Sequence, residues 1–333
     1  SYFITGWFDS LSNENFKLFN GWSKHARTED ARKKTKLLVG PWSHQVAPWG
    51  RLPMGDNGEY ADRSFGDQAL SDVIEMHTRW YDQHLKGIDT GINDEPPIKL
   101  FVMGANKWRF ENEWPIARTK WTHYYMHSEG NAAESGGILS TTPPEKTQPT
   151  DNFSYDPANP VNSLGSQYQT FDWCGPRDRS KIQLREDVLV FTTDPLVRDT
   201  EVTGPIRAKI WAASSAIDTD FTAALTDVEP DGKAIALCEG IVRARFRNGT
   251  DKPEMMIPGE IYEFEIDMWN TSNMFKEGHC IRIEISSSNF PRYNRNLNTG
   301  NPIATDIEIK IANQKLYHDS QHPSHVTLPI IPT

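Results

Sequence analysis

The sequence predicts an α/β layer followed by an all-β sandwich, and three observations along its 333 residues lead to this fold class. Residues 1–110 alternate short apolar runs with helical patterns, the order expected of a mostly parallel sheet flanked by helices. Residues 130–170 are rich in Gly, Ser, Thr, Asn and Pro, a composition typical of surface loops. From about residue 186 onward, β-rich runs recur with turn signals between them and no long helical pattern. This indicates an antiparallel sandwich, most commonly a jelly roll.

The strands of both parts are predicted from their apolar patterns. The runs at 2–6, 36–40 and 97–104 are short and continuously apolar, as expected for parallel strands buried on both faces. In the second part, alternating runs such as the one at 306–318 predict half-buried strands. Asp231-Gly232, inside EPDGK, predicts a hairpin turn.

Two helices are predicted in the first part. The first covers 12–27, and Ser12 or Asn13 could cap it. The second covers 67–87 and ends at Gly87. One side of this second helix is expected to be buried; it carries Leu70, Val73, Ile74, His77, Trp80, Tyr81 and His84.

Composition and charge argue against several classes of partner. The chain is 37% hydrophobic and 11% aromatic, with a net charge of −10 and no basic stripe, so nucleic acid and anionic membrane surfaces are poor partners. Its apolar runs are far shorter than the ~20 residues of a membrane span. Cys174, Cys238 and Cys280 have neither zinc nor disulfide spacing, and we interpret them as small buried hydrophobic residues. No metal or cofactor is expected.

Two polar residues follow strand-like runs in the first part. Asp9 comes after the run at 2–6, within TGWFDS, and His44 follows the run at 36–40, within VGPWSHQ. In α/β-hydrolases the triad acid and histidine lie in this chain order on loops at the carboxyl ends of strands. The Asp would hold the imidazole in its reactive tautomer, and the His would take the proton of a serine. A turn Asp and an ordinary loop His are the alternative that spacing alone leaves open.

The nucleophile that such a pair needs is not visible in the sequence. No G-x-S-x-G occurs in the 333 residues, and in triad order it would lie upstream of Ser1. Ser43 stands beside His44, but adjacent residues on an extended chain point in opposite directions. We therefore expect the serine to come from an upstream segment or a partner chain, and this chain alone to be inactive.

Six motifs in chain order resemble signatures of the cocaine-esterase-like serine hydrolases, whose relatives include X-Pro dipeptidyl peptidases, α-amino-acid ester hydrolases and glutaryl cephalosporin acylases. The motifs are GWFDS, LLVGPWSHQ, RWYDQHLKGIDTGI, PIKLFVMGANKWRFENEWP, REDVLVFTTDPLVRDTEVTGPI and SSSNFPRYNRNLNTG. The resemblance runs from residue 1 to about residue 330. It implies an α/β-hydrolase domain with a helical cap and a C-terminal jelly roll.

Matched residue by residue, the resemblance gives Asp9 the place of the triad acid and His44 that of the triad base. It implies that residues 1–110 are the C-terminal part of an α/β-hydrolase domain and residues 111–333 a jelly-roll sandwich. The nucleophile, the oxyanion-hole donors and the cap would lie upstream. The reaction implied is hydrolysis of a small-molecule ester or amide through an acyl-serine.

The substrate pocket implied by the resemblance is apolar. In α-amino-acid ester hydrolases, carboxylates two and three positions after the triad Asp bind the substrate ammonium, but Leu11 and Ser12 stand there in this chain. An α-amino acyl group is therefore disfavoured. Further candidates for the pocket wall are Phe8, Trp42 and Trp49, for which core packing is the alternative, and Trp173 from the loop leading into the sandwich.

A second hypothesis from another class is a non-catalytic jelly-roll binding module with a remnant hydrolase half. The pair Asp9 and His44 argues against it, because a remnant need not keep both residues at fitting positions. A metal site at His318, His322 and His325 is disfavoured against a surface turn, since no carboxylate or Cys set completes it. The chain opens without Met or a leader and is interpreted as a piece that begins inside a domain. Its compartment, cytoplasmic, periplasmic or secreted, and a homo-oligomeric state therefore stay open.

Overall fold

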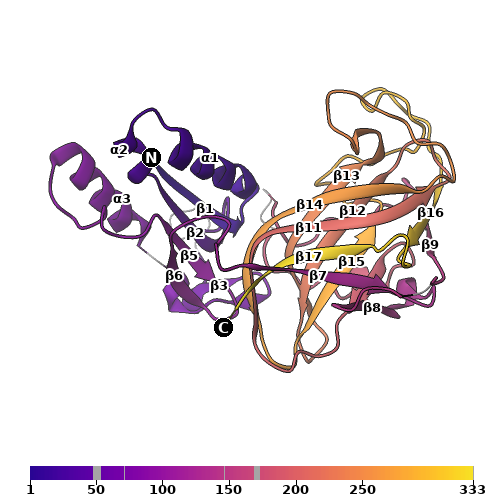
Figure 1. Ribbon diagram of the computed structural model, residues 1–333, viewed down its shortest axis with the longest axis horizontal. Helices are drawn as coiled ribbons and strands as arrows, with labels where there is room; N and C mark the ends of the chain where they lie inside the picture. The colour runs from indigo at the N-terminus through magenta and orange to yellow at the C-terminus, as the bar shows by residue number, and fades with distance from the viewer. Residues whose placement is uncertain (48–53, 71, 146, 169–172, 333) are drawn as a thin grey trace.

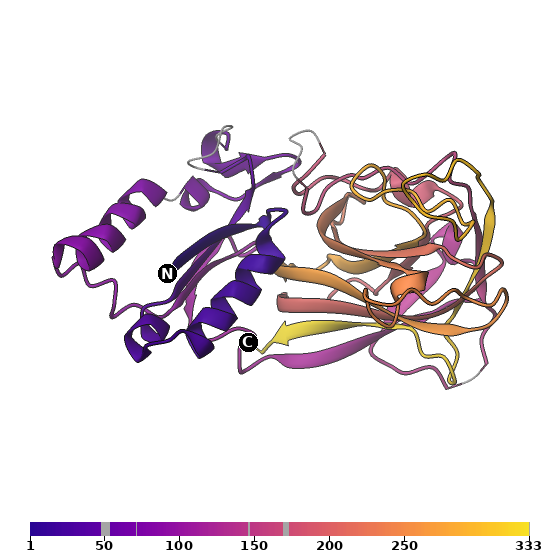
Figure 2. The same ribbon diagram turned by 90° about the horizontal axis from the view of Figure 1, so that it is seen from above.

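The computed structural model of the chain describes residues 1–47, 54–70, 72–145, 147–168 and 173–332. Two bodies of β-structure lie side by side (Figures 1 and 2). The first third of the chain forms a small helix-flanked sheet, and the rest forms a larger, mostly antiparallel structure. Among the described residues, no helix is both long and apolar enough to cross a membrane.

The first sheet has the strand order β1–β2–β5–β6. β1 (Tyr2–Phe8), β2 (Lys36–Ser43) and β5 (Ile98–Val102) are parallel, and β6 (Lys107–Glu111) runs antiparallel to β5. The three parallel strands predicted from continuous apolar runs are thus confirmed. β2 is buried along its whole length between two neighbours, which explains why its sequence does not alternate. β1 is an edge strand, and no described strand pairs with its outer side.

Helix α1 (Ser12–His25) follows β1, as predicted, but its start differs from the prediction. Neither Ser12 nor Asn13 is the cap, because the N-cap position is Leu11, whose side chain makes no capping bond. Asp9 accepts from the first free backbone donors instead. Its carbonyl oxygen accepts from the Ser12 N–H at 3.1 Å, and its carboxylate accepts from the Leu11 N–H at 2.9 Å. These two hydrogen bonds therefore hold both the first turn of α1 and the carboxylate of Asp9 in place.

The chain between α1 and β5 contains short elements and a broken helix. In order, these are α2 (Glu29–Lys33), β2, η1 (Asp56–Gly58), β3 (Glu59–Tyr60), β4 (Arg63–Ser64), η2 (Asp67–Leu70), α3 (Val73–Tyr81) and the π-helical turn η3 (Asp82–Lys86). A continuous helix over 67–87 is therefore wrong. Gly87 does end it as predicted, at a φ of 72° that favours glycine.

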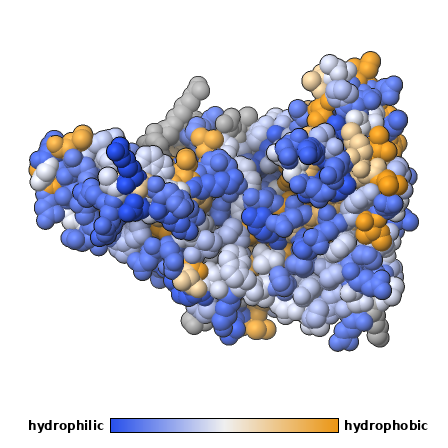
Figure 3. Space-filling model, turned by 45° about the horizontal axis from the view of Figure 1, so that its top comes forward, coloured by the Kyte–Doolittle hydropathy of each residue, from blue (hydrophilic) through white to orange (hydrophobic). Residues whose placement is uncertain are grey.

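The predicted apolar side of this broken helix is largely exposed, contrary to the prediction, and only Trp80 and His84 on it are half-buried among the described residues. Ile74 and Leu85 are 73% and 75% exposed, and Leu70 and Tyr81 are also exposed. Apolar side chains are visible on the surface at the end of the molecule that carries α3 (Figure 3). The periodicity predicted a face that needs a partner, and the described residues of this chain do not supply one.

The second part is built from strands joined by loops. They are β7 (Lys120–His127), β8 (Gly137–Ser140), β9 (Asp151–Tyr155), β10 (Leu189–Thr192), β11 (Thr200–Ser214), β12 (Asp220–Val228), β13 (Ala234–Arg243), β14 (Tyr262–Phe275), β15 (Cys280–Ser286), β16 (Ala312–Tyr317) and β17 (His325–Ile331). All pairings among them are antiparallel except β8 with β10. The only helices here are the one-turn segments η4 (Ala132–Glu134), η5 (Ile182–Leu184) and η6 (Ala244–Phe246), counted over the described residues. The prediction that 186–315 contains no long helix is confirmed.

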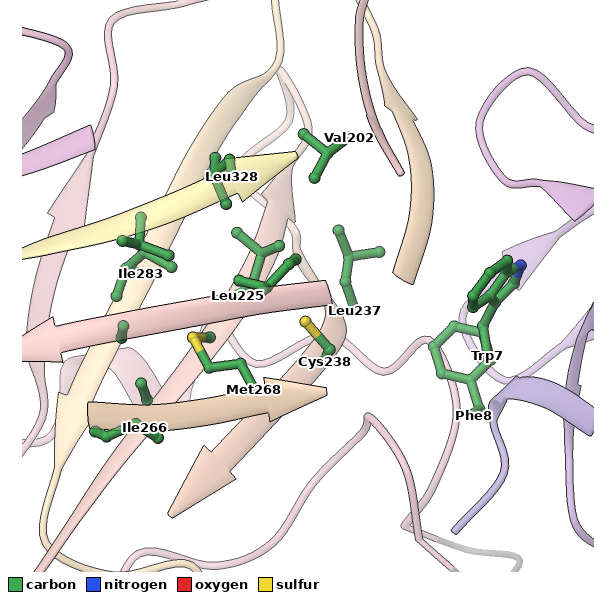
Figure 4. Close-up of a cluster of buried hydrophobic side chains, with 14 of the residues drawn as sticks. Trp7, Phe8, Val202, Leu225, Leu237, Cys238, Ile266, Met268, Ile283 and Leu328 are labelled. Carbon is green, nitrogen blue, oxygen red and sulfur yellow. The ribbon is translucent and has the colours of Figure 1, made fainter. Parts of the chain in front are cut away.

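The core of the second part lies between two facing layers of strands, as in a β-sandwich. Leu225 on β12 and Ile283 on β15 come from one layer, and Ile266 on β14 and Leu328 on β17 come from the other (Figure 4). All four are completely buried. Burial of such aliphatic side chains contributes about 1.5–3 kcal/mol each.

One predicted strand of the second part is shorter than expected. The alternating run at 306–318 forms β16 only from Ala312 to Tyr317, where it pairs with β9 and β11. Residues 306–311 lie outside any strand, and Ile307 is 91% exposed. Alternation alone does not make a strand, because a strand is stabilised by the pairs it forms with its neighbours.

An ion-pair cluster joins the β3–β4 hairpin to the second part. Arg63 donates to Asp227 on β12 at 2.7 Å and to Glu229 at 3.1 Å, and Asp227 is also bonded to His279 Nδ1 at 2.8 Å. The hydrogen bond with Asp227 raises the pKa of His279. Burial alone would raise the pKa of Asp227, but its bonds with His279 and Arg63 outweigh burial and lower that pKa.

This cluster predicts a pH-dependent contribution to stability. The raised pKa of His279 stabilises the fold below about pH 6.5, its unfolded value, and the contribution is lost as pH rises through the folded pKa. The lowered pKa of Asp227 contributes above about pH 4 and is lost as pH falls through the folded pKa. His279→Gln should therefore lower the free energy of unfolding more at pH 5 than at pH 8, measured by urea denaturation. An equal loss at both pH values would contradict the linkage.

A buried ion pair inside the second part should contribute more to the free energy of unfolding than the cluster at His279. Arg179 donates through Nε and Nη2 to both carboxylate oxygens of Glu284, and Nη2 lies 2.7 Å from Oε2. Both residues are buried. Glu284→Ala should lower the free energy of unfolding by about 3–5 kcal/mol, because the buried guanidinium loses its bidentate partner and, among the described residues, keeps only the longer ion pair with Glu239 at 3.6 Å. Glu265→Ala is the matched control. Glu265 and its partner Arg207 are both exposed, so their ion pair contributes about 1 kcal/mol or less to the free energy of unfolding. Similar losses for the two variants would refute this.

Candidate active site

Asp9 and His44 meet at the carboxyl ends of two neighbouring parallel strands. β1 ends at Phe8 and β2 at Ser43, and these two residues are paired in register. The next residue on each strand is therefore Asp9 and His44. Asp9 Oδ1 lies 3.3 Å from His44 Nδ1, slightly longer than the roughly 2.6–3.2 Å expected between an acid and a base that share a proton.

The two side chains differ in their exposure. The Asp9 side chain is 12% exposed, and the backbone N–H of Leu11 donates to the same carboxylate oxygen that faces the imidazole. The His44 side chain is 48% exposed. A held carboxylate thus contacts one nitrogen of an imidazole that solvent can reach, and such an imidazole can accept and return a proton.

Ser43 is occupied in the turn that carries His44. Its Oγ accepts from the backbone N–H of Val46 at 3.0 Å, and its own N–H donates to the Val46 carbonyl oxygen at 3.0 Å. Ser43 is also buried. This geometry agrees with the expectation that Ser43 is not the partner of the imidazole.

Two residues predicted to line the pocket lie in the core instead. Phe8 is fully buried and packs against the ring of Tyr60, and Trp42 is 1% exposed and donates through Nε1 to the Ala69 carbonyl oxygen. The structure therefore gives Phe8 and Trp42 the packing role that was the alternative interpretation. On a strand, Phe8 points away from the side of its neighbour Asp9, which explains the difference.

The other pocket candidates are at the surface or outside the described residues. Leu11 is 45% exposed beside Asp9, and Trp173 is 41% exposed and stacks on Tyr168. Trp49 falls in the segment 48–53, which lies outside the described residues.

The structure adds two residues to the neighbourhood of the site that sequence reasoning missed. Tyr60 packs against Phe8, and its hydroxyl lies 3.0 Å from Cys174 Sγ. Cys174 is buried, as predicted for it, but it touches a phenol rather than only apolar neighbours. No motif marks Tyr60, because its contacts join positions 114 residues apart.

The C-terminal histidines are not a surface turn throughout. His318 is completely buried, with Nε2 at 2.9 Å from Asp151 and Nδ1 at 2.8 Å from Gln148. Across the described residues, no group of three or more His, Cys, Asp or Glu side chains is arranged to hold a metal ion.

The comparisons with known proteins assign the chain to a family. Residues 90–327 match the family described as the X-Pro dipeptidyl-peptidase C-terminal non-catalytic domain, and the chain belongs to this family. The matched region begins after Asp9 and His44, so the candidate pair lies outside the part that the description calls non-catalytic.

The relatives of the chain are hydrolases. It is 42% identical over 334 residues to the cocaine esterase of Rhodococcus sp. (strain MB1 Bresler), covering 98% of this chain and 55% of that protein. A solved aminopeptidase from a marine sediment Thaumarchaeota archaeon is 25% identical, with a TM-score of 0.85, over 99% of this chain and 55% of that one. An α-amino acid ester hydrolase, 22% identical, shares the fold with a TM-score of 0.80 over the same shares of the two chains. The chain thus spans about half the length of these relatives.

Proposed function

We propose that this chain is the C-terminal part of a serine hydrolase that cleaves an ester or amide through an acyl-serine. The observation that carries the proposal is the contact of Asp9 with His44 at two adjacent strand ends, in a chain 42% identical to a cocaine esterase. Asp9 would orient and stabilise the imidazolium. His44 would accept the serine proton and return it to the leaving group.

We place the serine in an upstream segment or a partner chain that completes an α/β-hydrolase domain. In this division, residues 1–110 belong to that domain and residues 111–333 form a jelly roll. Two uncovered surfaces support the proposal that another segment or chain packs against this part. β1 has no described strand on its outer side, and such an open edge in a parallel sheet is normally paired or covered. The exposed apolar side chains Ile74 on α3 and Leu85 on η3 form a second uncovered surface.

The substrate site that fits this proposal is apolar and is reached past Leu11. Leu11 is 45% exposed next to the held carboxylate of Asp9, whereas Ser12 is completely buried. Neither residue offers a charge for a substrate ammonium. The non-catalytic binding module is not favoured, because relatives that match nearly the whole chain are hydrolases.

The test uses the complete protein, with its upstream segment, on nitrophenyl acyl esters and an aminoacyl-prolyl anilide. We expect ester turnover with an initial burst, and mass spectrometry should find the acyl group on an upstream serine. Turnover of the anilide alone would assign a peptidase instead of an esterase. Absence of turnover on all substrates, together with binding to a glycan panel, would favour the binding module.

A further inference from the structure

Tyr60 lies where the two strand ends of the site and the second part of the chain meet. It is the last residue of β3, and it is only 4% exposed. The edge of its ring packs against Phe8, with centroids 5.9 Å apart and planes at 79°. The side chain of Ser43 is a second polar neighbour of its hydroxyl. Phe8 and Ser43 directly precede Asp9 and His44, so Tyr60 contacts the neighbour of each member of the pair.

The contact with Ser43 reaches the turn that carries the imidazole. Ser43 binds Val46 twice, through its N–H and through its Oγ, and His44 lies between these two residues. A displacement of Ser43 would therefore move His44 relative to the carboxylate of Asp9. The Asp9–His44 contact is already long at 3.3 Å, so a small further increase in this distance would break the hydrogen bond.

A second set of contacts ties Tyr60 to the loop that leads into the sandwich. Its hydroxyl lies 3.0 Å from the Sγ of Cys174, which is completely buried. Gly175 packs directly on the phenol, because an added Cβ there would lie 2.5 Å from the Tyr60 Cζ. Asp62, two residues further along, accepts from the Asp178 N–H at 2.8 Å. The hairpin that carries Tyr60 is thus anchored in the second part.

The hydroxyl of Tyr60 favours its protonated form, so it can both donate and accept a hydrogen bond. Burial, reinforced by the neighbouring Cys174, raises the pKa of Tyr60 well above its ordinary value. With one proton and a free lone pair, the hydroxyl can donate to one of its two partners and accept from the other.

We propose that Tyr60 is a positioning residue that holds the His44 turn at the correct distance from Asp9. Cys174, in turn, ties Tyr60 to the loop that leads into the sandwich. The inference rests on the proposed function, because positioning is meaningful only if His44 is the base. It gives the second part of the chain a role in the reaction: the sandwich fixes the distance between acid and base without touching the substrate.

The experiment uses the complete enzyme and compares Tyr60→Phe, Cys174→Ala and Cys174→Ser with the parent protein. Tyr155→Phe is the matched control, because Tyr155 is also completely buried and its hydroxyl has no hydrogen-bond partner among the described residues. The measurements are kcat, KM, melting temperature and the low-field proton resonance of the imidazole N–H that faces Asp9.

Tyr60→Phe should lower kcat by about 10- to 100-fold, because small misplacements of reacting groups are costly. KM should change by less than about twofold, since the residue does not touch substrate. The low-field resonance should broaden or disappear. Cys174→Ala should act in the same direction, Cys174→Ser should recover most of the loss, and Tyr155→Phe should leave kcat and the resonance unchanged.

Other outcomes separate the two levels of the inference. If Tyr60→Phe only lowers the melting temperature, with kcat and the resonance of the parent, the positioning role is refuted. If Tyr60→Phe does not fold, unchanged kcat and resonance in Cys174→Ala refute the link to the sandwich. If His44→Ala itself keeps full activity, the proposed function fails, and the positioning role fails with it.

Discussion

His44→Ala in the complete enzyme is expected to lower kcat by about 10⁴-fold or more, the loss typical when a triad member is removed. The reason is that the half-exposed imidazole beside Asp9 would be the group that takes the serine proton. Asp9→Asn should cost less, because the base would remain in a poorly held tautomer. Steady-state kinetics on an activated ester measures both.

The matched control for this experiment is His25→Ala. His25 is an exposed histidine at the end of α1 and is not part of the candidate site, so its removal should leave kcat unchanged. A loss of less than about tenfold in His44→Ala would show that the imidazole is not the base. Unequal losses in kcat and kcat/KM would show that His44 also contributes to ground-state binding.

Residues 1–333 expressed alone should neither hydrolyse an activated ester nor react with a fluorophosphonate probe. The chain contains no G-x-S-x-G, and its one serine beside the imidazole, Ser43, is buried and bonded to Val46. Adding the upstream segment or partner chain should restore both turnover and labelling, with the label on the added polypeptide.

Circular dichroism supplies the control for this second prediction. The isolated chain must retain its β signal, so that missing activity reflects a missing nucleophile and not unfolding. Stoichiometric labelling of any serine within residues 1–333, together with turnover, would contradict the prediction.

The parts of the fold that the sequence predicted well are those where one physical requirement dominates. β2 is buried on both faces, so its run of apolar residues admitted few other interpretations. The meeting of Asp9 and His44 agrees with the strand order, because the carboxyl ends of parallel strands lie at one edge of a sheet. Spacing alone, however, left a turn Asp and a loop His open, and the family resemblance favoured the pair.

The errors arose where the sequence indicates that a surface must be buried but does not identify the segment that covers it. The apolar side of α3 predicts a buried face, but periodicity does not say whether the covering segment is in the same chain. Phe8 and Trp42 have the composition of a pocket wall and of a core equally, and only the direction of each side chain separates the two. The contact of Tyr60 with Cys174 depends on how the two parts of the chain pack, and no local pattern encodes that.

The outer strands β5 and β6 complete the first sheet, yet both lie inside the region 90–327 that defines the family. They are also fastened to the sandwich, since Met103 exchanges backbone bonds with β14 and Arg109 donates twice to Glu201 on β11 at 2.7 Å. Melting of the sandwich would therefore remove β5 from β2 and expose its apolar side chains to water. We therefore expect the two halves of this chain to unfold as one cooperative unit, so that a loss of stability far from His44 disrupts the Asp9–His44 contact at the same temperature.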